Sequence, residues 1–409
     1  MQRRDFLTLA GGAAALLPLG RGAWAAEATG GPKRLIVVML RGAVDGLNVV
    51  VPYSDPNYYA ARSSIAIQKP GSGDGAAFDL DGHFGLHPAL APLLPLWQAK
   101  QLAFVHASGS PDPTRSHFDA QLFIENGTPG RRSTADGWMN QLLAAMPDAR
   151  GPTSAVAVGP VLPQIPRGRL AVANLPMGPA AANPMAIDRP EIASAFDRLY
   201  AQDTAIGQSY RQGRAARSEL IGNMQSEQTM ADNGAPPPNG LPAQANRLAG
   251  LIARDRNIRL AFMDFGGWDT HVRQGNDKGQ LAGRLQPLGD GLATFARALG
   301  DDWHDTVVIV VSEFGRTVHE NGDGGTDHGH GNVMWVLGGA VRGGKIYGQW
   351  PGLATDALYQ GRDLAVTTDY RTVLAGIVET HLRLGDRALT AIFPNMPAER
   401  SEAAQLVSA

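Results

Sequence analysis

Short runs of β-branched and other apolar residues recur along the chain, and stretches with helical spacing of apolar residues separate them. Runs of this kind are typical of strands buried on both faces of a parallel sheet. Strands that alternate with helices indicate the α/β class. We therefore predict a mostly parallel central sheet flanked by helices on both faces. The predicted strands are Leu35–Leu40, Leu102–His106, Ala155–Val158, Leu170–Ala173, Leu260–Asp264, Thr306–Ser312 and Val333–Leu337.

A polar segment from Asp188 to about Met230 interrupts this alternation. It carries apolar residues at helical spacing, and a loop with three prolines follows it at residues 233–240. Prolines exclude a helix interior there, and helix is expected to resume at Pro242–Arg254. We interpret residues 188–254 as a helical insertion in a single domain that spans residues 26–409. The other predicted helices are Pro88–Ala99, Phe118–Asn126, Gly137–Ala145 and Leu281–Leu299.

The first 25 residues have the pattern of a twin-arginine signal peptide. Arg3 and Arg4 precede Asp5-Phe6-Leu7, an apolar run reaches Gly20, and Ala23-Trp24-Ala25 offers small residues for cleavage. The alternative is a membrane anchor, but a spanning helix needs about 20 apolar residues and the run is shorter. We predict export of the folded chain to the periplasm or another extracytoplasmic space, without a stable membrane span.

Charge and cysteine content exclude several classes of function. The chain has 36 basic and 38 acidic residues, and loss of the signal would remove more basic than acidic residues. A slightly acidic protein is not expected to bind nucleic acid, which requires a basic surface. The absence of cysteine excludes thiolate metal sites and cysteine nucleophiles. Nothing in the sequence indicates an oligomeric state.

Five polar clusters lie beside predicted strands: four follow a strand and one leads into a strand. Ligands of open parallel sheets bind outside the carboxyl ends of the strands, so these clusters are expected to form an active site. The densest, residues 325–331, contains Asp327, His328 and His330 among glycines. Imidazoles and carboxylates are divalent-metal ligands, although a solvated glycine-rich loop is the simpler explanation. Residues 266–271 offer Asp269 and His271, and here a helix N-cap is the alternative.

Two further clusters combine a carboxylate with an arginine. Glu313 closes the most strand-like run, where it either binds a metal or pairs with Arg316. Arg316 could instead clamp an oxyanion through its fork of donors. After the first strand, Asp45 is a candidate ligand and Arg41 a candidate anion contact, while a plain turn would explain the same residues.

The fifth cluster, residues 108–119, supplies hydroxyl groups. Thr114 or Ser116, next to Arg115 and His117, is a candidate nucleophile at a helix N-terminus. The alternative is that Ser116 is an ordinary N-cap.

Taken together, these motifs resemble the domain-of-unknown-function 1501 family. The segments that carry the resemblance are residues 35–59, 114–121, 266–271, 312–317 and 325–331, within a match from about Lys33 to Phe393. Ala43 departs from the pattern, in which a second glycine is expected. Members of the family typically carry twin-arginine signals, and the family is grouped with the alkaline phosphatase-like superfamily of phosphatases, sulfatases and phosphomutases.

This resemblance implies an α/β fold with a metal site at the strand ends, where a hydroxyl nucleophile attacks a phosphorus or sulfur ester. It makes Asp45 the ligand after the first strand and gives one metal to Asp269 and His271, joined by His328 or His330. Where the superfamily has an Asp-His pair, this chain has Glu313 and Phe314. The resemblance therefore predicts one divalent ion (zinc, manganese or calcium) rather than two, with Arg316 as a clamp.

Two functions follow as hypotheses. The first is an exported metal-dependent hydrolase acting on a small-molecule or glycan ester of phosphate or sulfate. The second is a non-catalytic exported binding or assembly protein that retains part of a phosphatase-like site. Convergence of the metal-binding side chains would favour the first, and a Glu313–Arg316 pair would favour the second.

Overall fold

The computed structural model describes residues 31–132, 134–149, 151–159, 162–175, 190–201, 204, 206–208, 210–212, 241–398 and 405–408. The chain divides into residues 1–31 and 32–409, and the elements below belong to the second unit. The predicted signal peptide and about half of the predicted insertion lie outside the described residues. Among those that are described, no helix has the length and apolarity needed to cross a membrane.

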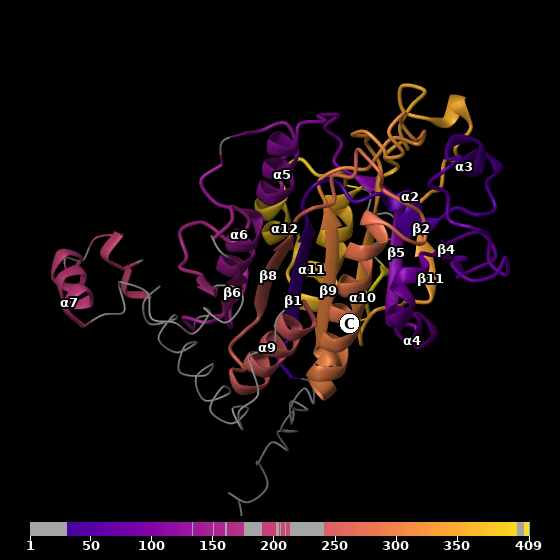
Figure 1. The fold of residues 1–409 in the computed structure, drawn as a ribbon. Coiled ribbons are helices and arrows are strands. Elements are labelled where there is room, and N and C mark those ends of the chain that lie inside the picture. The colour runs from indigo at the N-terminus through magenta and orange to yellow at the C-terminus, as the bar shows by residue number, and fades with distance from the viewer. Residues whose placement is uncertain are drawn as a thin grey trace, which may run out of the picture. The chain divides into compact units, whose positions relative to one another are not determined.

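A nine-stranded sheet forms the centre of the fold, with strand order β11-β5-β10-β9-β1-β8-β6-β7 and β12 paired to β5 (Figure 1). All neighbouring strands run parallel except β10, which is antiparallel to both β5 and β9. The predicted α/β class with a mostly parallel sheet is therefore confirmed. The strands are β1 (Arg34–Leu40), β5 (Leu102–Gly109), β6 (Ala155–Val158), β7 (Ala173–Leu175), β8 (Leu260–Phe265), β9 (Thr306–Ser312), β10 (Asn332–Gly338), β11 (Lys345–Tyr347) and β12 (Thr368–Asp369).

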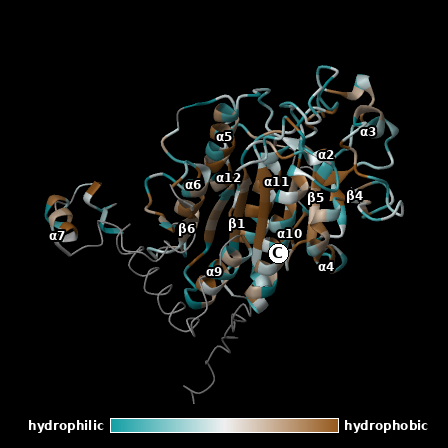
Figure 2. Ribbon diagram, in the orientation of Figure 1, coloured by the Kyte–Doolittle hydropathy of each residue, from teal (hydrophilic) through white to brown (hydrophobic). Residues whose placement is uncertain are grey.

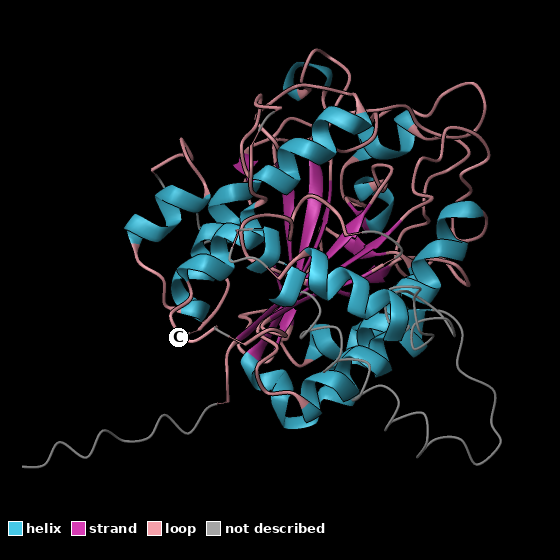
Figure 3. Ribbon diagram, turned by 90° about the vertical axis from the view of Figure 1, so that its left-hand side faces the viewer, coloured by secondary structure: helices cyan, strands magenta, loops and turns pink. Residues whose placement is uncertain are grey.

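Both faces of the sheet are buried, and alternate residues of β1 pack into different cores. Ile36 and Val38 join a core with helices α9 (Leu241–Arg254) and α10 (Gln280–Leu299). Leu35 and Val37 face the opposite core, which includes residues of α6 (Trp138–Ala145), α11 (Tyr370–Leu382) and α12 (Asp386–Ile392). Burial on both faces explains why the strands are continuously apolar (Figure 2), and helices lie on both sides of the strands (Figure 3).

Smaller elements surround this framework. Strands β2, β4 and β3 form a separate antiparallel sheet. The smaller elements, including these three strands, are β2 (Val50–Val51), β3 (Phe78–Asp79), β4 (Gly85–Leu86), α2 (Gly46–Val49), α3 (Pro56–Ala61), α5 (His117–Asn126), α7 (Pro190–Leu199) and the 3₁₀ turns η4 (Gly300–Asp305) and η5 (Thr355–Ala357).

Two predictions about elements need correction. The helix predicted at Pro88–Ala99 is a 3₁₀ turn, η1 (Pro88–Leu93), followed by α4 (Leu94–Gln98), because prolines interrupt its hydrogen bonding. The strand predicted at Leu170–Ala173 begins three residues later, as β7 (Ala173–Leu175). The side chain of Asn140 forms hydrogen bonds with both the N–H and the C=O of Leu170, so the backbone of Leu170 does not pair with a strand. Helix α9 confirms the helix predicted at Pro242–Arg254, and it packs in the same core as α10.

The antiparallel direction of β10 decides where the site forms. The carboxyl ends of β1, β5, β8 and β9 lie at one edge of the sheet, and an antiparallel strand among them begins at that edge. The glycine-rich loop that precedes β10 therefore meets the loops that follow the parallel strands.

Candidate metal centre

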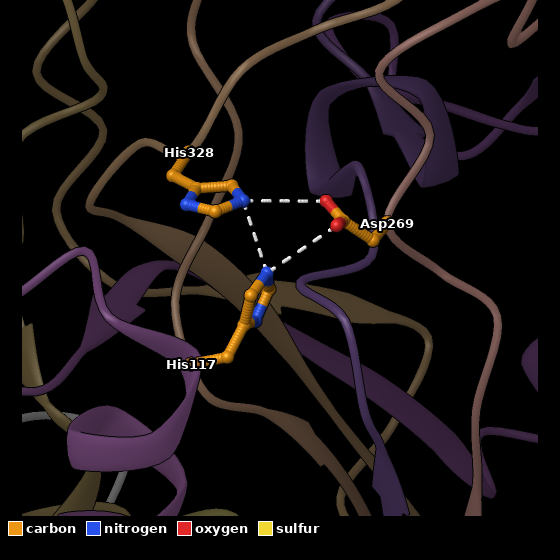
Figure 4. A group of neighbouring side chains, drawn as sticks. All are labelled: His117, Asp269 and His328. Atoms are coloured by element: carbon orange, nitrogen blue, oxygen red, sulfur yellow. Dashed lines mark hydrogen bonds and ion pairs between the residues drawn. The ribbon is translucent and has the colours of Figure 1, made fainter.

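His117, Asp269 and His328 turn ligand atoms toward one another at this edge of the sheet (Figure 4). One ligand atom from each lies within 4.8 Å of the others. His271 adjoins the group, with its Nε2 2.9 Å from Asp269 Oδ1 and 3.0 Å from His328 Nε2. We call these four residues the metal-facing group.

Three different loops supply the group. His117 is the first residue of α5, which follows β5. Asp269 and His271 follow β8, and His328 lies in the loop before β10. The site thus gathers residues that are far apart in the sequence and that only the sheet topology brings together.

Glycines let the loop of His328 lie directly against the segment after β9. Arg316 and His328 form an antiparallel bridge, and the Gly329 N–H donates to the Gly315 C=O over 2.8 Å. A Cβ on Gly329 would come within 2.5 Å of the Arg316 carbonyl group. This close approach, rather than loop flexibility, is the reason for glycine at this position.

The Nδ1 atom of each histidine in the group is bonded to an oxygen that only accepts hydrogen bonds. Nδ1 of His117 donates to Glu313 Oε1 over 2.8 Å, and Nδ1 of His271 donates to Asp327 Oδ1 over 3.0 Å. Nδ1 of His328 donates to the backbone carbonyl of Arg115 over 2.9 Å. These partners assign the proton to Nδ1, so the Nε2 atom of each neutral ring carries a lone pair.

The lone pairs therefore converge. His328 Nε2 lies 3.0 Å from His117 Nε2 and 3.3 Å from Asp269 Oδ1. Lone pairs at such distances repel unless a proton or a cation lies between them. A tetrahedral ion with bonds of about 2.0–2.1 Å would hold its ligand atoms about 3.3 Å apart, close to the spacing found here. The residues fit a divalent ion, and each imidazole has the oxygen partner that metal-bound histidines usually have.

Arg316 holds the carboxylate of the group. Its Nη1 donates to Asp269 Oδ1 over 2.6 Å, and the guanidinium is almost completely buried. Burial alone would raise the pKa of Asp269, but the hydrogen bond and charge of Arg316 lower it below its ordinary value. Asp269 is therefore an anion near neutral pH, as a metal ligand must be.

The two imidazoles that meet at 3.0 Å have opposite pKa shifts. The hydrogen bond that His117 donates to Glu313 raises the pKa of His117, while burial and the nearby His117 lower the pKa of His328. Burial would raise the pKa of Glu313, but its bonds from His117 and Gln121 lower it. The site thus keeps Glu313 charged and His328 neutral.

Several sequence-predicted ligands have other roles. Glu313 and Asp327 do not face the other ligand atoms. They accept hydrogen bonds from Nδ1 of His117 and Nδ1 of His271. Glu313 forms no ion pair with Arg316. Such a pair would have favoured a non-catalytic protein. Its Oε1 also accepts from the backbone N–H of Gly42. Ala43, where a second glycine was expected, has a φ of 58°, in the region that favours glycine.

Asp45, Arg41 and His330 do not join the metal-facing group. Both oxygens of Asp45 accept hydrogen bonds from the buried Arg62, so the carboxylate belongs to a buried ion pair. Arg41 is bonded to two carboxylates, Glu125 and Asp264, which neutralise its charge. His330 stacks on Tyr359 with the ring centroids 4.6 Å apart. Of the two histidines in the glycine-rich loop, it is His328 that reaches the group.

The two candidate nucleophiles accept backbone hydrogen bonds. Ser116 is the N-cap of α5 and accepts from the Asp119 N–H, while the Thr114 hydroxyl accepts from the Ser116 N–H. These contacts correspond to the capping alternative for Ser116. His117, the next residue, is the side chain that this segment contributes to the group, and sequence reasoning did not select it. A histidine directly after an N-cap at a strand end was the available signal.

The fold and this set of donors define an α/β protein with a candidate metal centre at the carboxyl edge of its sheet. The chain belongs to the family described as "Protein of unknown function (DUF1501)", whose model matches residues 32–393. A comparison with curated protein sequences finds no match.

Several solved structures are similar to the chain at low sequence identity. Ps i-CgsB, in complex with a neocarrahexaose, has a TM-score of 0.38 at 11% identity, and the match covers 92% of this chain and 75% of the Ps i-CgsB chain. A mutant of the alkaline phosphatase of the Antarctic bacterium TAB5, with Mg bound, has a TM-score of 0.34 at 13% identity, and the match covers 78% of this chain and 95% of that one. The C-terminal periplasmic domain of EcEptC from Escherichia coli, complexed with Zn, has a TM-score of 0.35 at 10% identity, with coverages of 76% and 74%.

Proposed function

We propose that the protein is an exported hydrolase of phosphate or sulfate esters that works with one divalent ion. The observation that carries the proposal is the convergence of the Nε2 atoms of His117, His271 and His328 beside Asp269. Imidazole and carboxylate donors favour zinc, or manganese as a second choice, whereas calcium takes oxygen ligands. The substrate is a small-molecule or glycan ester.

Some side chains of the site would bind the ion, and others orient the side chains that bind it. His117, His328 and Asp269, with His271, would hold the ion, which when bound activates water and neutralises charge on the ester oxygens. Glu313 and Asp327 keep Nδ1 protonated on their partner rings, so that Nε2 is free to bind. Arg316 is buried and bonded to Thr326 and Asp269, so it holds Asp269 in place instead of clamping an oxyanion as predicted.

Zinc titration of the chelated protein without its signal tests this proposal. We expect one zinc ion per chain, with binding abolished in His328→Ala and retained in His330→Ala, since His330 only stacks on Tyr359. Aryl phosphate and aryl sulfate esters then report turnover by the zinc-loaded protein. Equal zinc binding by the two variants would contradict the assignment of the site.

The competing function is a non-catalytic exported binding or assembly protein. The capping contact of Ser116 favours it, because that hydroxyl already has a structural partner. Stoichiometric zinc binding without hydrolysis of either ester class would support this second function and exclude the first.

A further inference from the structure

A buried chain of hydrogen bonds runs from Asp45 to the metal-facing group, and the proposed function makes no use of it. Gln274 Nε2 donates to Asp45 Oδ2 over 2.6 Å. Thr326 Oγ1 donates to Gln274 Oε1 over 3.0 Å and accepts from Arg316 Nε over 3.1 Å. Arg316 then bonds Asp269.

The two ends fix the direction of every bond in this chain. The Asp45 carboxylate, paired with Arg62, only accepts, so the Gln274 amide must present its NH₂ there and its oxygen to Thr326. The Thr326 hydroxyl must then donate to Gln274, which leaves its lone pairs for Arg316 Nε–H, a group that only donates. A chain with one allowed direction permits a single arrangement of its amide and hydroxyl groups.

Thr326 also holds a second nitrogen of the guanidinium, because its backbone carbonyl accepts from Arg316 Nη2. With Nε and Nη2 both bonded to Thr326, Nη1 of Arg316 is directed at Asp269 Oδ1. Gln274 and Thr326 are both completely buried, so water does not replace a lost partner. The orientation of the carboxylate in the group thus depends on a hydroxyl that does not touch it.

We infer that Gln274 and Thr326 are positioning residues, which set the metal-binding geometry of Asp269 through Arg316. This inference rests on the proposed metal centre. It gives Asp45 a role different from the one that the sequence suggested: Asp45 orients Gln274 through a direct hydrogen bond and does not contact the metal-facing group. Asp45→Asn is a poor test, since it would leave the buried Arg62 without its counter-ion.

Thr326→Val is the decisive variant because valine has the shape of threonine without the hydroxyl. Thr270→Val is the matched control: Thr270 Oγ1 donates to the same Gln274 oxygen over 2.7 Å, and Thr270 is equally buried, yet Arg316 bonds Thr326. Thr326→Ser keeps the hydroxyl and provides the rescue. Near-ultraviolet circular dichroism of the metal-free proteins verifies that each variant is folded.

The measurement is the zinc dissociation constant by competition with a chelating dye. We expect Thr326→Val to weaken zinc binding at least about tenfold, as is usual for partners of metal ligands, and Thr326→Ser and Thr270→Val to stay close to the wild type. In the metal-free protein, NMR should show faster solvent exchange of the Arg316 Nε–H in Thr326→Val alone.

Two results would overturn the inference: unchanged zinc affinity in Thr326→Val, or an equal loss in Thr270→Val. Absence of zinc binding by the wild type would instead overturn the proposed function, and this inference with it.

Discussion

His117 Nδ1 donates a 2.8 Å hydrogen bond to Oε1 of Glu313, a carboxylate that is almost completely buried. Oε1 also accepts from Gln121, whose own oxygen accepts from Arg41. The metal-facing group is therefore connected to the ends of β1 and β9 by a continuous network. In this network Glu313 acts on the metal site through His117.

We predict that Glu313→Gln weakens zinc binding about tenfold while the protein remains folded. Glutamine can still accept the hydrogen bond from His117, but it lacks the negative charge that makes the ring a stronger donor. The zinc dissociation constant measures the effect. Glu320→Gln serves as the control, since Glu320 binds Ser63 and Ser64 and no member of the group. Equal affinity of Glu313→Gln and the wild type would contradict the role given to the carboxylate.

Gly329→Ala should destabilise the protein by about 1–3 kcal/mol and abolish zinc binding. The added Cβ would meet the Arg316 backbone, which cannot move aside without separating His328 from the rest of the group. Gly322→Ala is the control, because no atom lies within 4 Å of the Cβ that alanine would add there. Urea unfolding and zinc titration measure both effects. Identical behaviour of the two variants would show that the close approach is unimportant.

Ser116→Ala should cost about 1 kcal/mol of stability, the usual effect of losing an N-cap hydroxyl. Ser116→Asn separates capping from catalysis, since asparagine caps helices but is no hydroxyl nucleophile. If Ser116 only caps α5, Ser116→Asn will match the wild type in thermal stability and in ester hydrolysis. Loss of hydrolysis with normal stability would restore the serine as the nucleophile.

Stability should decrease as the pH falls from about 6.5 to about 4, in part because of His87, His106 and His381. Burial lowers the pKa of each to about 4 from the ordinary value of 6.5. The unfolded chain therefore takes up protons at these rings first, so their contribution is complete above pH 6.5 and is lost below it. One ring accounts for about 2 kcal/mol between pH 6.5 and pH 5.

Urea unfolding at pH 7.5 and pH 5 tests this dependence. The loss of stability between the two pH values should be smaller by about 2 kcal/mol in His381→Gln than in the wild type. The exposed His304 gives a matched variant, His304→Gln, in which the full loss is expected. Equal losses in all three proteins would refute the assignment to the buried rings.

Replacement of Arg3 and Arg4 by lysine should stop accumulation of the protein outside the cytoplasm, because the export route requires the arginine pair. Arg21→Lys, which changes an arginine of the same segment outside the pair, should be exported normally. Immunoblots of periplasmic and cytoplasmic fractions make the comparison. Normal export of the double-lysine protein would contradict the proposed route.

The sequence was sufficient to predict the central strands and the edge that carries the site. A run such as Thr306–Ser312 is apolar throughout, and both of its faces are buried. Loops after such strands must meet at one edge, so Asp269, His271 and His328 could be named from the pattern. The antiparallel direction of β10 has no comparable signal, since a buried strand has the same composition in either direction.

Ligands and their supporting residues could not be separated from the sequence. Glu313 and Asp327 differ from Asp269 only in how far their side chains reach into the group, which depends on packing between loops. His117 was not predicted, because the hydroxyl groups of Thr114 and Ser116 were interpreted as the functional groups of this segment. The ion pair between Asp45 and Arg62 could not be predicted, because Arg62 lies in a different loop. Asp45 was therefore interpreted as a metal ligand.

The pairing of β5 also determines when the site can form during synthesis. Within the described sheet, β5 is bonded to β10, β11 and β12, all of which follow it by more than two hundred residues. A nascent chain that has not yet reached β10 has nowhere to dock β5, and His117 follows that strand. Ribosome-bound fragments that end before Asn332 should therefore be unable to load metal.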